Sequence, residues 1–392
     1  MKYIGIDLHK KTIVLCVMNK ERQVVQRQKF FCAETDRISE YFRGLGEFSF
    51  AVEATGTYEW LANLLSPLAQ SWVLVNPSRF EIIAKSAQKT DRHDAHNLAE
   101  FLALGMLPKA YYPPARVREH RLLVRYRVQC RRRVSHLICR IRQVAARYNA
   151  DRKDLLDSEV MEAFQQRADL SEADRFVLKR LLIEHRHALE YLEEAAAELS
   201  RFAKQASPAE KREREILQSA PGVGPIVTDV VLAELGEVSR FPSIKDVSAY
   251  AGLVPKLDES GDKAKQLKIT KAGSRLLRWG MVQAAWQAVR TSDRWRGVFE
   301  SIKRRRGAKR AIIAVARRLL GVLVSMLKQG KEYRWSLAEL KYREGQQEKR
   351  RQRRIMKRQA AATKQATKSE VAPVQEEKPK RTRRTKKETV MA

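Results

Sequence analysis

The chain has 392 residues, and its 78 lysines and arginines outnumber 46 aspartates and glutamates, for a formal net charge of +32. The last 52 residues carry +12 of this charge, so the remaining excess is spread along the preceding part of the chain. This composition argues against a metabolite enzyme and favours a polyanionic partner, with nucleic acid as the first candidate. The length predicts two or three domains.

Cysteine spacing and apolar runs argue against a disulfide-bonded or zinc-binding protein, a secreted protein and a membrane protein. The four cysteines form no CxxC pair and have no histidine at zinc spacing, so we expect reduced thiols in a cytoplasmic protein. Asp7 lies inside the only early apolar run, which argues against a signal peptide. Arg317 and Arg318 interrupt the most apolar later run, residues 311–327, so we expect no membrane span.

Residues 1–110 are predicted to form a mixed α/β domain. Three apolar segments between residues 2 and 31 are separated by polar turns, a pattern typical of consecutive antiparallel strands. Helices and strands then alternate, as in a mixed sheet with helices packed on it. The expected elements are helices over 35–44, 58–68 and 79–104 and strands over 48–54 and 72–77.

Residues 111–207 are predicted to form long helices, with a coiled coil as one arrangement. No Gly or Pro occurs in the 93 residues from 115 to 207. Residues 109–148 contain 12 lysines and arginines and one acid, Glu119, whereas residues 171–205 are acid-rich and balanced. The basic part is either the charged face of a coiled coil or a surface that contacts nucleic-acid phosphates, and the missing acidic partners favour the second.

Residues 208–340 are predicted to form a mainly helical second globular domain. The sequence APGVGP at 220–225 separates two helical segments, a helix-hairpin-helix pattern in which Gly222 and Gly224 permit close approach of a DNA phosphate. A tight turn between two helices needs the same residues, so that alternative stays open. We also expect a loop over 255–264 and helices near 272–290 and 308–328.

Residues 341–392 are predicted to be a disordered basic tail. The segment lacks apolar periodicity and is rich in Ala, Thr, Lys, Glu and Pro. Its charge is typical of tails that bind nucleic acid without sequence preference.

Four carboxylates of the N-terminal domain could meet at one end of its sheet. Asp7 lies in the first strand, Glu53 ends the fourth, and Asp91 and Asp94 lie one helical turn apart. Such a group would bind two divalent cations and suit phosphodiester cleavage or strand transfer. The alternative is that Asp7 caps a turn and the other two are exposed helix acids.

For this domain, an alternative protein class and an alternative role of one segment stay open. An aspartate that ends a first strand also occurs in actin-like ATPases and sugar kinases, although no later Gly-rich run here could hold an adenosine. The sequence EATGTY at 53–58 follows a strand and precedes a helix, so it is either a phosphate contact or an ordinary helix start.

Ser260 lies in a basic segment of the second globular domain, followed closely by four lysines. Cations could hold the charge of a phosphorane-like transition state, but a serine hydroxyl also needs a base or metal to remove its proton. Nothing local supplies one, so from its own surroundings Ser260 is better explained as a turn residue.

Seven motifs favour the functional interpretation of these residues over the structural one. They occur in the same order as the motifs of the DEDD recombinases of the one-ten family of bacterial insertion sequences, which the chain resembles. The likeness runs from about residue 2 to 330 and spans two domains, which makes it specific. The motifs are GIDLHK at 5–10, VEATGTY at 52–58, KTDRHDA at 89–95, APGVGP at 220–225, AGLVP at 251–255, ESG at 259–261 and ITKAGSRLLR at 269–278.

The resemblance implies an N-terminal domain similar to the Holliday-junction resolvase (RuvC-like) branch of the RNase H fold. Asp7, Glu53, Asp91 and Asp94 match the family's DEDD ligands for Mg²⁺ or Mn²⁺, and Ser260 matches its nucleophilic serine. The helical middle would mediate assembly into a dimer or, in synapsis, a tetramer. The tail has no inherited role.

The family also implies partners and a bacterial cytoplasmic location, with nucleoid association when bound. These partners are donor and target DNA and a structured non-coding guide RNA that pairs with both. The candidate nucleic-acid contacts of this chain are Gly222, Gly224, Arg125, Arg131, Arg132, Arg133, Lys263, Lys271 and Arg275.

The sequence therefore predicts a metal-dependent transposase that cuts and rejoins DNA through Ser260. One alternative is a junction-resolving or RNase H-type nuclease that uses the carboxylates and water without a covalent serine intermediate. A second alternative is a non-enzymatic DNA-architectural or RNA-binding protein.

Overall fold

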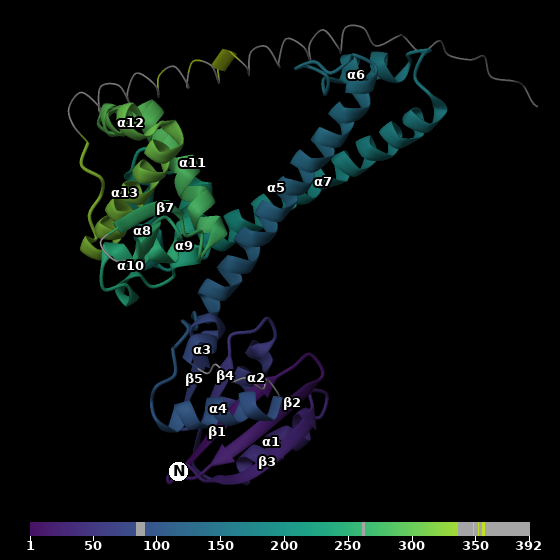
Figure 1. The fold of residues 1–392 in the computed structure, drawn as a ribbon. Helices are drawn as coiled ribbons and strands as arrows, with labels where there is room; N and C mark the ends of the chain where they lie inside the picture. Colours follow the sequence, from purple (N-terminus) through teal and green to yellow (C-terminus); the bar gives the residue numbers. More distant parts are fainter. Residues whose placement is uncertain (84–90, 261–262, 336–347, 349–351, 353–354, 357–392) are drawn as a thin grey trace, which may run out of the picture. The chain divides into compact units, whose positions relative to one another are not determined.

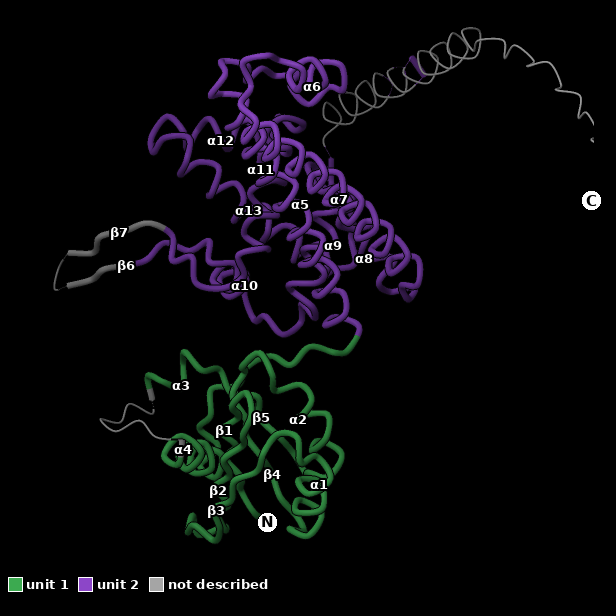
Figure 2. Tube along the Cα trace, turned by 90° about the vertical axis from the view of Figure 1, so that its right-hand side faces the viewer, with its two compact units in different colours: residues 1–115 green, residues 116–392 purple. Residues whose placement is uncertain are grey.

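A computed structural model describes residues 1–83, 91–260 and 263–335, together with Glu348, Gln352, Ile355 and Met356 (Figure 1). The chain forms two compact units, Met1–Ala115 and Arg116–Ala392 (Figure 2). The finer division into four regions stays a prediction, and apart from those four residues the expected basic tail lies outside the described residues. Within the described ranges, no helix is both long and apolar enough to cross a membrane.

The first unit is built on one five-stranded sheet with strand order β3-β2-β1-β4-β5. β1, β2 and β3 are antiparallel, whereas β4 and β5 run parallel to β1. This confirms the predicted mixed α/β architecture. The strands are β1 (Lys2–Leu8), β2 (Thr12–Met18), β3 (Val24–Phe31), β4 (Phe48–Glu53) and β5 (Ser71–Val75), and the helices are α1 (Thr35–Arg43), α2 (Tyr58–Leu65), α3 (Pro77–Ile83) and α4 (Asp91–Ala103).

Alternation along the strands separates two packed faces of this sheet. Ile4 and Ile6 of β1 are fully buried in a core with side chains of α1 and α2. Gly5 points to the opposite face, where a Cβ atom would lie 2.0 Å from the carbonyl oxygen of Ala95 in α4. Glycine is therefore needed for β1 and α4 to pack backbone against backbone, and the two faces are visible in Figure 2.

The second unit begins with two long helices that pack antiparallel. α5 (Ala115–Arg147) and α7 (Glu172–Lys204) each have 33 residues, and the short α6 (Ser158–Gln165) lies between them in the chain. Ile141 of α5 shares an apolar cluster with Leu178 near the start of α7, and Val124 shares another with Leu199 near its end. The prediction of long helices is confirmed, and the supercoiling of a coiled coil stays a prediction.

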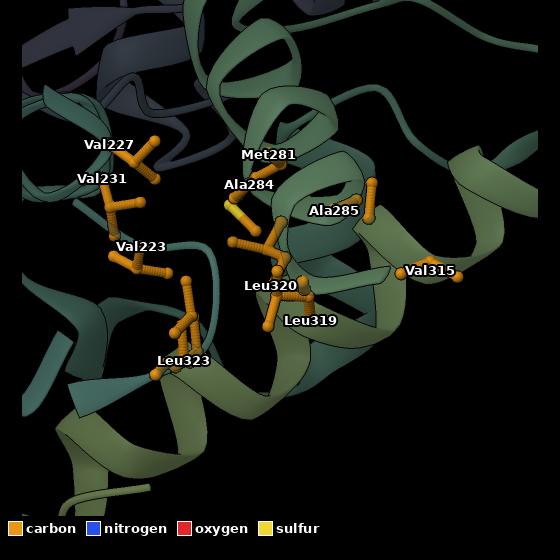
Figure 3. Close-up of a cluster of buried hydrophobic side chains, with 14 of the residues drawn as sticks. Val223, Val227, Val231, Met281, Ala284, Ala285, Val315, Leu319, Leu320 and Leu323 are labelled. Carbon is orange, nitrogen blue, oxygen red and sulfur yellow. The ribbon is translucent and has the colours of Figure 1, made fainter. Parts of the chain in front are cut away.

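The remainder of the second unit is mainly helical around an apolar core. Val227 and Val231 of α9, Met281 of α11, and Leu319 and Leu320 of α13 pack together there (Figure 3). The elements are α8 (Pro208–Ser219), α9 (Pro225–Leu235), a 3₁₀ turn (Val238–Arg240), α10 (Ile244–Tyr250), β6 (Pro255–Ser260), β7 (Lys263–Ile269), α11 (Arg275–Thr291), α12 (Asp293–Arg306) and α13 (Ala308–Gln329).

Two expectations for this region were wrong. Residues 255–260 and 263–264 are not a loop, because β6 and β7 pair antiparallel from Pro255 and Ile269 to Ser260 and Lys263, whereas residues 261–262 lie outside the described residues. The residues of β6 and the first residues of β7 are mostly polar or charged, so the alternation of apolar and polar residues that marks a strand is missing. The helix α12 was also missed, since four consecutive basic residues in its last turn obscure the buried Trp295 and Phe299.

Candidate active site and nucleic-acid interface

The strand register places Asp7 and Glu53 at neighbouring positions. β1 and β4 are parallel, and Ile6 pairs with Val52, so Asp7 and Glu53 come next on adjacent strands. Alternation puts both residues on the sheet face of Gly5, which is the face covered by α4. The side chain of Asp7 is 17 % exposed. The sheet therefore brings together two of the four predicted carboxylate positions.

The helix α4 adds the other two acids. Asp94 is half-buried and directly precedes Ala95, the residue whose carbonyl oxygen lies against Gly5 of β1. Asp91 is the first residue of α4, and its side chain lies outside the described residues. The structure thus places Asp7, Glu53 and Asp94 on the same side of the sheet.

Carboxylate oxygens are the ligands that Mg²⁺ and Mn²⁺ prefer, so these residues fit a divalent cation by donor type. Among the side chains that the structure describes, however, no group of three or more His, Cys, Asp or Glu is close enough to hold a metal ion. The fold gathers the donors on one face, and ligation by all four residues stays a prediction.

His9 is a site residue that the sequence analysis missed. Its Nε2 atom lies 3.0 Å from Oδ2 of Asp7. The contact is close in distance but does not have hydrogen-bond geometry, so it places the ring beside the carboxylate without a hydrogen bond between them. The available signal was the spacing of the two residues in GIDLHK, where a turn after the strand lets a side chain two positions on reach back.

The segment EATGTY connects β4 to α2. Thr57 is the N-cap residue of α2 but its side chain makes no capping hydrogen bond, and Gly56 would have open space around a Cβ atom. Thr55 Oγ1 is buried and has no hydrogen-bond partner among the described residues. The side chain of an ordinary N-cap residue would bond a backbone N–H, so the phosphate-contact reading stays open here.

Ser260 is the last residue of β6 and pairs with Lys263, the first residue of β7. Residues 261–262 and the side chains of residues 257–268 lie outside the described part of the chain, so the surroundings of the hydroxyl and of the Lys263 ammonium are not described. The backbone places Ser260 at the far end of a two-stranded hairpin.

At the base of this hairpin, two glycines allow the backbone segments to pack against each other. At Gly252, with φ of +64°, a Cβ atom would lie 2.4 Å from the carbonyl oxygen of Ala272. At Gly273, with φ of +103°, it would lie 2.1 Å from the carbonyl oxygen of Tyr250. The backbone N–H of Ser274 also donates to that Tyr250 oxygen at 3.0 Å. The motifs AGLVP and ITKAGSRLLR therefore position the hairpin that carries Ser260.

The turn between α8 and α9 contains both predicted glycines. Gly222 has φ of +78°, and a Cβ atom there would lie 2.3 Å from the carbonyl oxygen of Ala284 in α11. Packing alone therefore explains Gly222. Gly224 is exposed as the N-cap residue of α9, with Pro225 following, and it has open space around it. A phosphate contact by this turn stays a prediction.

The predicted arginine contacts fall into two groups. Arg131, Arg132 and Arg133 are exposed on α5 and form no ion pair with any described residue. Arg125 instead binds Glu234 of α9 with two hydrogen bonds of 2.9 and 3.2 Å, and these bonds raise the pKa of the guanidinium. Glu234 is 2 % exposed and was missed, because an acid within an apolar helix has no distinctive spacing.

The remaining predicted contacts lie beside the hairpin. Lys271 is exposed and has φ of +55°, in the left-handed region. Arg275 is the exposed first residue of α11. Both follow β7 closely in the chain, so they flank the hairpin base.

Comparison with known proteins identifies the family. Residues 4–150 match the model of the DEDD transposases of IS110 type, and residues 214–300 match that of the IS116/IS110/IS902 transposase family, so the two models together cover more than half of the chain.

Full-length relatives agree with these matches. A probable family 20 transposase of Pseudomonas aeruginosa is 26 % identical over 84 % of this chain and 98 % of its own length. The transposase for insertion sequence element IS1111A of Coxiella burnetii is 23 % identical over 85 % and 92 %. A pilin gene-inverting protein of Moraxella bovis is 26 % identical over 84 % and 97 %. The resemblance seen in the motifs is confirmed, and the chain belongs to the IS110 family of transposases, which are DNA recombination enzymes.

Proposed function

We propose that this transposase cuts and rejoins DNA by attack of the Ser260 hydroxyl on a phosphodiester, and that Asp7, Glu53, Asp91 and Asp94 form the metal-binding part of its active site. The observation that carries the proposal is the register of β1 and β4, which sets Asp7 beside Glu53 on the face covered by α4. Carboxylates at neighbouring strand positions repel one another, and a bound divalent cation would relieve that repulsion.

Strand transfer through a serine conserves the number of phosphodiester bonds. The Oγ atom of Ser260 forms a bond to phosphorus as its proton passes to a carboxylate, and the bond from phosphorus to the leaving DNA oxygen breaks. Attack by the hydroxyl of another strand reverses these steps and releases the serine. A bound Mg²⁺ or Mn²⁺ supplies charge stabilisation at the phosphate.

The proposal assigns His9 and the hairpin base to positioning. Nε2 of His9, 3.0 Å from Oδ2 of Asp7, would orient that carboxylate, and the contacts of Gly252 and Gly273 fix where the hairpin of Ser260 begins. Acidic groups on one unit and the serine on the other would act together in an assembled complex of several copies on DNA.

The exposed arginines of α5 support a role in binding nucleic acid. Arg131, Arg132 and Arg133 of this helix are exposed and form no ion pair with a described residue, so phosphate backbones would suit them as partners. We assign this surface to DNA and to a structured guide RNA that pairs with donor and target, in a dimer that assembles further in synapsis.

The test of the proposed function is the covalent intermediate. Ser260→Ala should abolish strand exchange and the protein–DNA adduct on a denaturing gel while leaving DNA binding intact. Ser239→Ala, at an exposed serine of the same unit, is the matched control and should keep both activities. An adduct that persists in Ser260→Ala contradicts the role of Ser260. Hydrolysed ends without rejoining or adduct in the unaltered protein would instead identify a metal-dependent nuclease.

A further inference from the structure

A cleft of about 400 Å³ lies between α5 and the first turn of α11. Apolar contacts hold the two helices at this spacing, because Val128 and Leu276 belong to the same buried cluster. Three arginines line the cleft together with three other polar residues. These six are Arg125, Arg132, Arg275, Ser274, Tyr250 and Glu234.

The charges in the cleft do not cancel. Both carboxylate oxygens of Glu234 are bound to Arg125, and Oε2 also accepts a hydrogen bond of 2.9 Å from Ser274 Oγ. Arg132 and Arg275 are exposed and form no ion pair within the described part of the chain. One pair is neutral, so two positive charges remain for an anion.

Glu234 also organises the rest of the cleft. It is almost fully buried, so its charge is stable there only while Arg125 and Ser274 bind it. Ser274 is the N-cap residue of α11, and its Oγ accepts the backbone N–H of Leu277 at 3.0 Å. One buried carboxylate thus ties α5 to the start of α11.

The cleft adjoins the hairpin that carries Ser260. Ser274 follows Gly273 at the hairpin base, and β7 begins at Lys263, which pairs with Ser260. A seven-residue strand spans roughly 23 Å, which equals about seven base pairs of duplex measured along its axis. A duplex whose axis follows the hairpin from Ser260 would therefore present further phosphates near the cleft.

We infer that the cleft between α5 and α11 binds a backbone phosphate of the DNA strand on which Ser260 acts, through Arg132 and Arg275. Glu234 is a positioning residue that holds Arg125 and Ser274 in place. The choice of DNA rests on the proposed role of Ser260, because the hairpin leads from the cleft to that serine.

The test is the salt dependence of binding to a duplex oligonucleotide. In the double variant Arg132→Gln, Arg275→Gln, the slope of log K against log salt concentration should become shallower by about 1 to 2, as expected for the loss of one or two phosphate contacts. Arg186→Gln, at an exposed arginine of α7 without an ion pair to any described residue, should keep the original slope. An unchanged slope in the double variant overturns the inference.

Two further measurements separate other sources of phosphate. Inorganic phosphate that raises the melting temperature of the unaltered protein but not of the double variant, with equal DNA affinity in both, would show a small-anion site and overturn the inference. A slope that falls only for structured RNA would overturn the choice of DNA.

The outcome for Ser260 is distinguishable. If the double variant loses slope while Ser260→Ala still forms the adduct, the cleft is a DNA phosphate site, whereas the role of Ser260 and the assignment of the cleft to its strand are refuted. If Ser260→Ala abolishes the adduct while the double variant keeps its slope, the proposed role of Ser260 is supported and phosphate binding by the cleft is refuted.

Discussion

The two long helices of the second unit have the same length but opposite surfaces. α5 carries eleven arginines and one acid, whereas α7 carries seven acids and six lysines and arginines. Opposite charges could have joined them, yet their contact is the apolar seam of residues such as Ile141 and Leu178. Within the described residues, one ion pair joins the two helices, between Arg147 and Asp174 at one end of the pair.

The comparison shows that only part of the charge of α5 is used in contacts within the chain: Arg131, Arg132 and Arg133 form no ion pair with a described residue, although other arginines of the helix pair with acids. Surface ion pairs contribute little to stability, and few of the arginines have a partner on α7. An uncompensated basic surface on a helix held by apolar contacts is suited to a polyanion from outside the chain. Each of the next three predictions tests a part of this difference.

The largest effect is expected from the exposed arginines of α5. Replacing Arg131, Arg132 and Arg133 by Gln should reduce the salt slope of nucleic-acid binding by about 3 and weaken binding about 100-fold at 0.15 M salt. The matched control replaces Lys179, Arg180 and Arg186 of α7 by Gln, all of which are exposed. Equal losses of salt slope and affinity in the two triple variants would show that α5 and α7 do not differ in nucleic-acid binding.

A smaller effect separates two kinds of arginine on α5. Arg125→Ala leaves the buried carboxylate of Glu234 without its guanidinium partner, and should lower the free energy of unfolding by about 1–3 kcal/mol, discounted for the exposure of Arg125. Arg132→Ala should change it by less than about 0.5 kcal/mol, because Arg132 has no ion pair with a described residue. Urea unfolding measures both, and similar values would show that Glu234 does not depend on Arg125.

The smallest effect concerns the seam itself. His185 lies between Leu181 and Ala188 on the buried side of α7, and its Nε2 atom is buried without a hydrogen-bond partner among the described residues. Burial lowers the pKa of this imidazole. The stability linked to the neutral ring is therefore complete above the unfolded pKa of about 6.5 and is lost as the pH falls below it.

His185→Leu should remove this acid sensitivity, with an effect of about 1 kcal/mol or less between pH 7 and pH 5. Thermal unfolding at several pH values is the measurement. His187→Leu, at an exposed histidine of the same helix, should keep the pH dependence of the unaltered protein. Parallel curves for the unaltered protein and His185→Leu would refute the assignment.

Much of the first unit could be predicted because its signals are local. The apolar segments of residues 2–31 alternate strongly and are separated by polar turns, and the structure confirms three antiparallel strands there. The acids Asp7 and Glu53 could be chosen as strand-end residues, and the register then sets them at neighbouring positions.

Apart from the neighbouring pair His9 and Asp7, the contacts that escaped prediction join residues distant in sequence. Glu234 contacts Arg125, which lies 109 positions away, and Gly222 fits against Ala284 of α11. The hairpin of Ser260 has polar strands that pair with each other, so no apolar periodicity marks it. Local patterns contain none of this information, because it arises only when the helices pack.

The most direct test of the central claim is metal-dependent strand exchange by Asp7→Asn, which keeps the size of the side chain and removes its charge. The account predicts that cleavage and adduct formation in Mg²⁺ fall by about 100-fold or more while DNA affinity is unchanged. Asp36→Asn, at an exposed acid of α1, should retain full activity. Undiminished cleavage by Asp7→Asn would contradict the claim that these carboxylates carry the chemistry.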